Sequence, residues 1–427
     1  MVQECGCRPV SFTKRGRASR QTTHESPSIM NPLLVLAIAI FCTMLGNGVV
    51  MPFIPLYAQQ FGAASLGAGL LFSAHSAPRT FLLPLIGPAS DRMGRRSFLL
   101  VGVLLYALSS VAFLLANSMG LLLLIMGIQG IATAMVQPVT LAYVGDLTPK
   151  GKEGAYAGYI NTAFLGGVAG GPILGGVLKD AINMQASFVA LGLFSLFAFV
   201  LMFFWLPDPP KHKTAANAVV PPFREVFSCR PVIGVAYYRL GYAFASTITW
   251  VFVPLLAARM LPLKTSQIGA LISLNVLVST ILQAPFGRLA DRMSKANLVA
   301  IGGTISAIAF SAFPLATSFW HLLALSVVTG VATGVAFPAH TALAMENARG
   351  LGMGTVMSFL LTVHSFGMTV CPILFGLIAD HFGMNSTFYG GGLLCALTTA
   401  ICYLMTHDAP IETTAEKVRE KEAAVTD

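Results

Sequence analysis

Residues 158–176 read GYINTAFLGGVAGGPILGG, a series of glycines in an otherwise apolar segment. Gly167, Gly171 and Gly175 are four residues apart, so on a helix they would form one bare stripe. In a soluble helix each glycine would cost about 1 kcal/mol relative to alanine. In a bilayer the backbone must satisfy its own hydrogen bonds, so the helix persists. A stripe of small residues lets a second helix approach closely. The segment therefore predicts a membrane helix packed tightly against a neighbour.

The composition of the whole chain is that of a membrane protein. Its 427 residues are 55% hydrophobic and only 10% charged, with a mean hydropathy of +0.75. Soluble proteins carry about 25% charged residues. Twelve apolar runs are each long enough to cross the roughly 30 Å hydrocarbon core of a bilayer. They span residues 32–56, 65–87, 98–116, 120–145, 155–178, 185–206, 232–257, 266–289, 297–316, 321–345, 354–379 and 386–406. We predict an all-α integral membrane protein with twelve transmembrane helices.

Sequence blocks of the first half recur 200 residues later in the second half. One constant offset over four separated regions does not arise by chance. The matched positions include Gly87 and Gly287, Asp91 and Asp291, Gly130 and Gly330, Pro138 and Pro338, Asp146 and Glu346, Pro172 and Pro372, and Asp180 and Asp380. A duplicated unit predicts two pseudo-symmetric six-helix bundles, residues 32–206 and 232–406, with a binding site between them near the membrane midplane.

Lysine and arginine are distributed unevenly among the predicted loops. With the N-terminus inside, the inner segments hold 20 of the 26 basic residues and the outer segments hold 3. The positive-inside rule therefore places both termini in the cytoplasm, and we interpret the membrane as a bacterial inner membrane. The net charge of +9 follows from this topology and requires no nucleic-acid partner. The cytoplasmic segments are a tail expected to be disordered, a linker and a second tail, residues 1–31, 207–231 and 407–427.

The glycine pattern is more specific than a packing stripe, although a packing face alone is the simpler interpretation of the glycines. The pattern is G-x8-G-x3-G-P-x2-G-G, and its six positions are filled by Gly158, Gly167, Gly171, Pro172, Gly175 and Gly176. It resembles the antiporter signature in helix five of the drug:proton antiporters of the major facilitator superfamily. The resemblance implies the major facilitator fold, a helix five packed between the two six-helix halves, and export of the substrate.

A second signature lies between the second and third apolar runs. The segment GPASDRMGRRS, residues 87–97, places one acidic residue among arginines. A positive-inside loop explains the arginines but not the acid and the glycines. The segment resembles the superfamily's signature G-x-L-A-D-R-x-G-R-R and departs from it at residues 88–90. By this resemblance a gating latch that holds the inward-closed state comprises Gly87, Asp91, Arg92, Gly94, Arg95 and Arg96, with Asp146 as a further gating residue.

The charged residues deep inside the predicted helices are basic. Met126 stands where the antiporter family has an arginine in helix four, and no acidic residue lies deep in any predicted helix. Arg79 and Arg239 lie about 12 Å from the inner helix ends. A charge at the bilayer centre costs at least about 2.5–3.5 kcal/mol, so it normally faces a cavity; the alternative is that each arginine snorkels or bonds backbone carbonyls. Other substrate or proton candidates are His75, His364, Asn47, Gln137 and Tyr238.

The sequence favours a secondary active transporter over an enzyme, since it has no nucleotide-binding or metalloprotease motif. The first hypothesis is proton-coupled efflux of small amphipathic or drug-like compounds by alternating access. The second is an organic-anion carrier that uses Arg79 and Arg239. The third is a non-transporting membrane receptor or scaffold, which the intact gating signature disfavours. We expect a monomer whose partners are a small-molecule substrate, protons and the lipid bilayer, without catalytic residues, metal or cofactor.

Overall fold

A computed structural model describes residues 31–148, 153–208, 229–347 and 353–407. The predicted N-terminal tail, most of the predicted linker and most of the predicted C-terminal tail lie outside these residues. All regular secondary structure in the described residues is helical, as the sequence predicted. The helices are α1 (Pro32–Val50), α2 (Ile54–Ala58), α3 (Ser65–Met93), α4 (Arg95–Leu114), α5 (Met119–Leu147), α6 (Glu153–Ala181), α7 (Met184–Trp205), α9 (Arg230–Thr247), α10 (Val253–Met260), α11 (Thr265–Ala290), α12 (Lys295–Ala312), α13 (Phe319–Asn347), α14 (Met353–Phe382) and α15 (Met384–Thr406).

Short turns of other helix types join or end some of these elements. Two 3₁₀ turns, η1 (Met51–Phe53) and η2 (Gln59–Phe61), flank α2, and a third, η4 (Phe313–Leu315), follows α12. A π-helical turn, η3 (Ile248–Phe252), joins α9 to α10. With α1 and α2 taken together, and α9 and α10 likewise, the described chain forms twelve long helical segments.

Eleven of the long segments in the described chain are apolar enough to cross a membrane. The exception is α3, which carries Arg79, Asp91 and Arg92. Helix α3 packs against α5 on one side and against α14 of the other half on another. These protein neighbours cover much of α3, so it needs less apolar surface for lipid.

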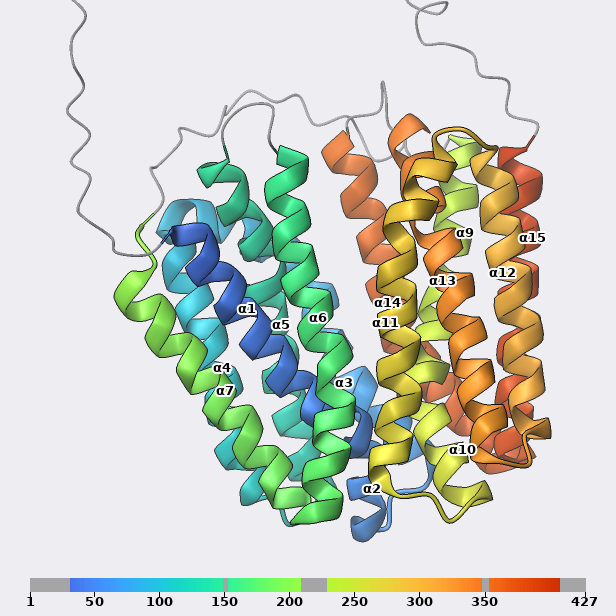
Figure 1. Cartoon of the computed structure of the whole chain (residues 1–427), viewed down its shortest axis with the longest axis horizontal. Helices are drawn as coiled ribbons and strands as arrows, with labels where there is room; N and C mark the ends of the chain where they lie inside the picture. The colour runs from blue at the N-terminus through green and yellow to red at the C-terminus, as the bar shows by residue number, and fades with distance from the viewer. Residues whose placement is uncertain (1–30, 149–152, 209–228, 348–352, 408–427) are drawn as a thin grey trace, which may run out of the picture.

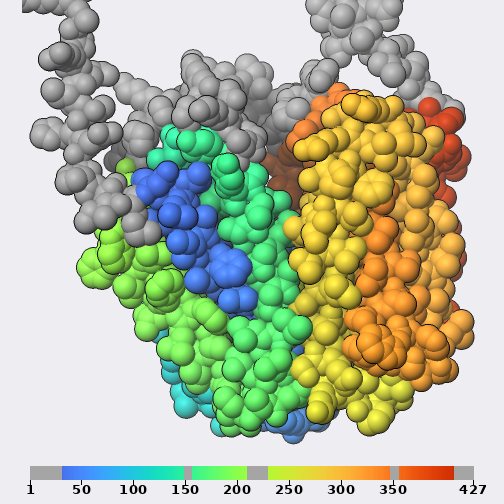
Figure 2. All heavy atoms as spheres, in the orientation of Figure 1, coloured from blue at the N-terminus to red at the C-terminus, as the bar shows by residue number. Residues whose placement is uncertain are grey.

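The two halves are built from equivalent elements at one offset. Helices α3 and α11 begin at Ser65 and Thr265, and α7 and α15 begin at Met184 and Met384. Figure 1 shows the halves as two bundles side by side, an N-terminal bundle of α1–α7 and a C-terminal bundle of α9–α15. Figure 2 shows α6 and α11 in contact along the lower part of this face. The predicted pair of pseudo-symmetric bundles is confirmed.

The two ends of the molecule differ. Helix α1 begins and α15 ends at the same end, at the top of Figure 1, which we call the terminal end. Helices α2 and α10 lie at the opposite end, which we call the distal end. The topology prediction assigns the terminal end to the cytoplasm and the distal end to the outside.

Helix α3 is longer than the sequence predicted. The predicted apolar run ends at residue 87, whereas the helix continues through Pro88 to Met93. It ends at Gly94, whose φ of 101° is accessible to glycine and strained for other residues. Because of this extension, Arg79 lies about 21 Å from the terminal end of its helix, farther than the sequence suggested.

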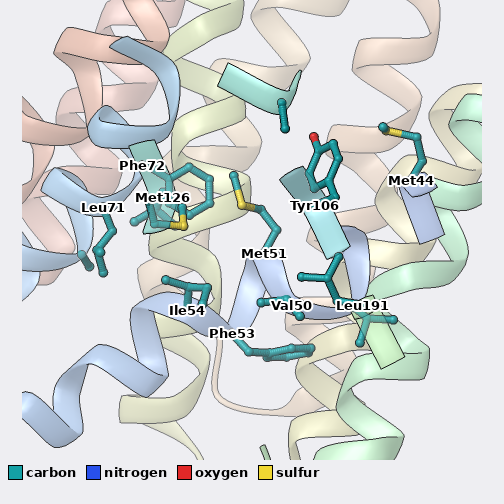
Figure 3. Close-up of a cluster of buried hydrophobic side chains, with 14 of the residues drawn as sticks. Met44, Val50, Met51, Phe53, Ile54, Leu71, Phe72, Tyr106, Met126 and Leu191 are labelled. Atoms are coloured by element: carbon teal, nitrogen blue, oxygen red, sulfur yellow. The ribbon is translucent and has the colours of Figure 1, made fainter. Parts of the chain in front are cut away.

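The core of the N-terminal bundle is apolar where the helices converge, as Figure 3 shows. Side chains of α1, η1 and α2 meet those of α3, α4, α5 and α7 there. Met126 lies in this cluster and is 0% exposed. The position where the antiporter family has an arginine is therefore a dry packing position in this chain.

Candidate substrate site between the bundles

The glycine stripe of α6 faces α1 of the same bundle. A Cβ atom added to Gly167 would lie 2.5 Å from the carbonyl oxygen of Phe41, and one added to Gly171 would lie 2.5 Å from the Cα of Gly48. One added to Gly175 would overlap the carbonyl group of Val49. Any side chain on the stripe would push the two helices apart. The resemblance implied packing between the halves at these positions, whereas the stripe packs within one half.

Another face of α6 contacts the other bundle. A Cβ atom added to Gly269 of α11 would overlap the carbonyl oxygen of Pro172, and one added to Gly176 would lie 2.5 Å from the carbonyl oxygen of Thr265. The backbone N–H of Ile173 donates a hydrogen bond of 3.0 Å to Ser273 Oγ. Helix α6 is thus held between α1 and α11. Gly158, near its terminal end, has open space where a Cβ would stand.

The equivalent contact joins α14 to α3. A Cβ added to Gly69 would overlap the carbonyl group of Pro372, the counterpart of Pro172. Ser73 Oγ donates to the carbonyl oxygen of Thr369 at 2.6 Å, and the hydroxyls of Thr80 and Thr369 lie 3.1 Å apart. The glycine–proline contacts lie in the distal parts of α3, α6, α11 and α14, so the bundles meet closely there, and the Thr80–Thr369 contact lies near the middle of α3 and α14.

In the N-terminal bundle a short polar network surrounds the first buried cation. Tyr106 and Thr133 share a hydrogen bond of 2.6 Å, and His75 Nε2 lies 3.4 Å from Thr133 Oγ1. The phenol of Tyr106 is within electrostatic reach of Arg79. Arg79 Nε and His75 Nδ1 are buried without a hydrogen-bond partner in the described part of the chain. Each of these two nitrogens could therefore form a hydrogen bond with a bound substrate or water.

In the C-terminal bundle the second cation lies among aromatic rings. Arg239 is 7% exposed, and its guanidinium carbon lies 5.8 Å from the centre of the Phe337 ring. Tyr242 stacks on His364, with ring centres 5.4 Å apart. Within the described residues, Arg239 Nε and His364 Nδ1 have no hydrogen-bond partner.

A second histidine of this cluster is already engaged. His340 Nδ1 lies 3.1 Å from the carbonyl oxygen of Ala336, and its ring packs 5.2 Å from that of Tyr238. This hydrogen bond fixes the ring, as expected for a structural histidine. Tyr238 thus belongs to the packing around His340. His364, by contrast, keeps a free ring nitrogen.

The two arginines converge from opposite bundles. His364 lies within electrostatic reach of both Arg79 and Arg239. Neither guanidinium forms a salt bridge with any residue the structure describes. Two like charges near one point of a low-dielectric interior repel and are costly to desolvate. The arrangement is therefore suited to an anionic group placed between them.

The remaining predicted candidates differ in their surroundings. Asn47 has a buried Oδ1 without a hydrogen-bond partner among the described residues. Gln137 is half-buried on α5, one turn beyond Thr133. The structure thus gathers Arg79, His75, Arg239 and His364 around one region.

A cavity of about 140 Å³ opens beside this region, between α6 and the C-terminal bundle. Its wall combines aromatic rings with hydroxyl and amide groups; examples are Tyr242, Trp250, Phe310, Ser279, Thr280 and Gln283. Sequence reasoning did not single out the last five. Asn275, Ser279 and Gln283 are four residues apart in an apolar helix, and this polar stripe could have indicated the wall.

The sequence profile of the Major Facilitator Superfamily matches residues 36–241 and 238–426, which is most of the chain. The chain belongs to the Major Facilitator Superfamily. As a member of this transporter family it is not an enzyme. The fold agrees with this assignment: a bacterial homologue of the human lysosomal transporter Spinster, solved in an inward-facing and unoccupied conformation, superposes with a TM-score of 0.77. The superposition covers 90% of this chain and 98% of that one, at 16% sequence identity.

Curated relatives span nearly the same length. An uncharacterised MFS-type transporter of Methanocaldococcus jannaschii is 27% identical over 379 residues, covering 87% of this chain and 97% of the relative. The multidrug resistance protein MdtG of Proteus mirabilis is 24% identical, with 84% and 91% covered. The quinolone resistance protein NorA of Staphylococcus aureus is 22% identical, with 82% and 90% covered.

The superfamily's loop signature forms ion pairs within the N-terminal bundle. Arg95 lies between two carboxylates, 2.9 Å from Asp91 and 3.0 Å from Asp146. Arg96 donates to the carbonyl oxygen of Phe203 at 2.5 Å, which ties α4 to α7. These contacts connect helices of one bundle, so the latch between inward-open and inward-closed states remains a prediction.

The glycines and the remaining arginine of this signature have simpler surroundings. Gly94 makes the turn from α3 to α4, Gly87 has open space where a Cβ would stand, and Arg92 is exposed. The second copy keeps one pair of the network, because Lys295 lies 2.7 Å from Glu346. Each bundle thus has an ion pair at its terminal end. It joins a basic residue just after the loop signature to an acidic residue at the end of the fourth helix of that bundle.

Proposed function

We propose that this superfamily member exports small amphipathic organic compounds in exchange for protons by alternating access. The observation that carries the proposal is the cavity beside α6, whose wall mixes aromatic rings with hydroxyl groups. Such a wall binds an apolar body and orients a few polar groups. The cavity adjoins the distal contact between the bundles, so rocking of one bundle against the other would change access to it.

The direction of transport is supported by the relatives. Two of them are named as multidrug and quinolone resistance proteins, and resistance proteins of this superfamily remove compounds from the cell. The six filled positions of the antiporter pattern in α6 support the same direction.

Histidines are the groups we propose for proton exchange. In the described helices the carboxylates lie near helix ends, for example Asp91 and Asp180. His75 and His364 lie in the helix interiors and each keeps a free ring nitrogen. An imidazole can take up and release a proton, and beside Arg79 and Arg239 it would do so when an anionic substrate or water offsets the charge of the arginines.

A second candidate function is transport of organic anions. The specific observation is that Arg79 and Arg239 are without a salt-bridge partner among the described residues and both act on His364. A guanidinium can hold a carboxylate or phosphate through two parallel hydrogen bonds. An anionic substrate would also relieve the repulsion between the two cations.

Purified protein in proteoliposomes tests these proposals together. Anionic, neutral and cationic amphipathic compounds are compared, each with and without a pH gradient. Efflux of neutral and cationic compounds that depends on the gradient supports the first function. Transport restricted to anions supports the second. Binding without any transport would mean that the protein acts as a receptor or scaffold.

Arginine variants assign the substrate class within the same assay. Arg79→Ala and Arg239→Ala are compared with Arg288→Ala, which removes an exposed arginine at the end of α11. If Arg79→Ala and Arg239→Ala lose anion transport and Arg288→Ala keeps it, the two buried arginines bind the anionic substrate. If all three behave as the unmodified protein does, the arginines have no part in substrate binding.

A further inference from the structure

A carboxylate at the distal end of α6 caps a helix of the other bundle. Asp180 accepts hydrogen bonds from the backbone N–H groups of Thr265, at 2.9 Å, and Ser266, at 2.7 Å. These are the first two residues of α11. The first N–H groups of a helix have no partner within the helix, and its N-terminus carries a partial positive charge. A carboxylate is therefore a strong partner for them.

The second bundle returns the same contact. Asp380, at the distal end of α14, accepts hydrogen bonds from the backbone N–H groups of Ser65, at 3.0 Å, and Leu66, at 2.9 Å. These residues begin α3 of the N-terminal bundle. The residue before them is Ala64, whose side chain has no group that could cap the helix. Each bundle thus supplies the cap for one helix of the other.

Several other helix starts in the described chain are capped locally. Asn183 caps its own helix α7 by accepting from the N–H of Ala186 at 2.9 Å, and Ser118 accepts from the N–H of Leu121 in α5 at 3.4 Å. A local cap stays intact when the bundles move as rigid bodies. The caps supplied by Asp180 and Asp380 cross between the bundles, so they break when the distal ends separate.

Close packing surrounds both caps. Close backbone contacts flank each cap, Gly269 against Pro172 on one side and Gly69 against Pro372 on the other. Arg259 of α10 adds a hydrogen bond of 3.3 Å to Ser65 Oγ. A route from the cavity to the distal side opens only when α11 leaves α6 or α3 leaves α14.

We propose that Asp180 and Asp380 form a pair of outer latches that hold the distal end closed and release α11 and α3 in each transport cycle. They are positioning residues, since they lie at the distal helix ends and act on the relative placement of the bundles. The latches are symmetric, so both must release for full opening. Removal of either cap should shift the protein toward the state that is open at the distal end.

Chemical labelling of one buried position measures this shift directly. Ser273 is 8% exposed and lies in the α6–α11 contact. In the variant Ser273→Cys the introduced thiol can react with a membrane-impermeant maleimide added on the distal side only when the bundles separate. Mass spectrometry of the labelled peptide distinguishes this thiol from native cysteines. The labelling requires neither substrate nor proton gradient, so its failure is separable from failure of the proposed function.

The variants Asp180→Ala and Asp380→Ala should each accelerate labelling, by about tenfold if the lost hydrogen bonds to a charged group have their usual strength. The double variant should be faster still, and Asp180→Asn should be intermediate, because an amide keeps one acceptor oxygen. Asn183→Ala is the matched control, since it removes a cap of similar length that stays within one bundle.

Two results would overturn the proposal. One is an unchanged labelling rate in both alanine variants. The other is equal acceleration by Asn183→Ala, which would mean that any loosened helix start exposes position 273. Thermal unfolding and size-exclusion elution of each variant identify a misfolded protein. If an alanine variant misfolds, the comparison of Asp180→Asn with Asn183→Ala decides, and an unchanged rate there also overturns the proposal.

Discussion

Arg79 and Arg239 belong to opposite bundles, yet both lie within electrostatic reach of the same side chain, His364. Neither has a salt-bridge partner among the residues the structure describes. A pair of buried cations without acids is destabilising unless something else stabilises the charges. This relationship distinguishes the chain from a transporter whose cavity is built around a carboxylate, and it leads to the first prediction.

Replacement of either arginine by lysine should damage anion transport almost as much as replacement by alanine. Lysine keeps the charge but cannot form the paired hydrogen bonds of a guanidinium. We expect at least about a tenfold lower rate for Arg239→Lys with an anionic substrate, as loss of a charge-assisted hydrogen bond implies. Transport of a neutral substrate in the same vesicles is the control. Full activity of both lysine variants with anions would mean that charge alone is required.

The histidine that the arginines approach should carry the proton dependence. In His364→Gln the side chain still fills the site and forms hydrogen bonds, but it no longer titrates. Substrate should still bind, whereas the stimulation of efflux by a pH gradient should be lost. His340→Gln is the matched comparison, because His340 is fixed by its bond to Ala336. Retained stimulation in His364→Gln would assign the proton to another group.

The glycine stripe offers a sharp pair of variants on one helix. Gly171→Leu places a large side chain where the Cα of Gly48 stands 2.5 Å from the added Cβ, so α1 and α6 must separate. We expect loss of transport and a lower unfolding temperature. Gly158→Leu should be tolerated, because its added side chain meets open space. Similar behaviour of the two variants would show that the close packing of α6 on α1 is not required.

The loop signature should affect transport more than stability. In Asp91→Asn the 2.9 Å ion pair with Arg95 is lost, while Arg95 keeps its contact with Asp146. Partly exposed ion pairs usually contribute about 0–1 kcal/mol to stability. The unfolding temperature should therefore change little, whereas the transport rate should fall strongly if the pair gates the terminal end. Glu346→Gln, which breaks the Lys295–Glu346 pair at the terminal end of the second bundle, is the control. Normal turnover in Asp91→Asn would remove the gating role.

The fold could be predicted from the sequence because its determinants are local or repeated. Apolar runs of the right length mark each helix, and the offset between Asp91 and Asp291 marks the duplication. The apolar runs end short of some helices, as at α3, which continues through Pro88 to Met93. Neighbouring helices tolerate a proline in a membrane helix by satisfying the freed backbone groups.

The site was only partly predictable, because its contacts are between distant segments. Arg79 and Arg239 could be recognised as charges in apolar runs, but nothing local shows that both approach His364. The stripe of α6 indicated a close neighbour without naming α1. Asp180 and Asp380 were visible as a repeated pair, and only the three-dimensional arrangement shows that each caps the other bundle.

A reversible cross-link between the two bundles tests alternating access most directly. The hydroxyls of Thr80 in α3 and Thr369 in α14 lie 3.1 Å apart across the bundles. The double variant Thr80→Cys, Thr369→Cys places two thiols within the range of a disulfide. Oxidation should stop efflux from proteoliposomes, and a reducing agent should restore it, while single-cysteine variants under oxidant stay active. Unchanged efflux by the fully cross-linked protein would contradict the account.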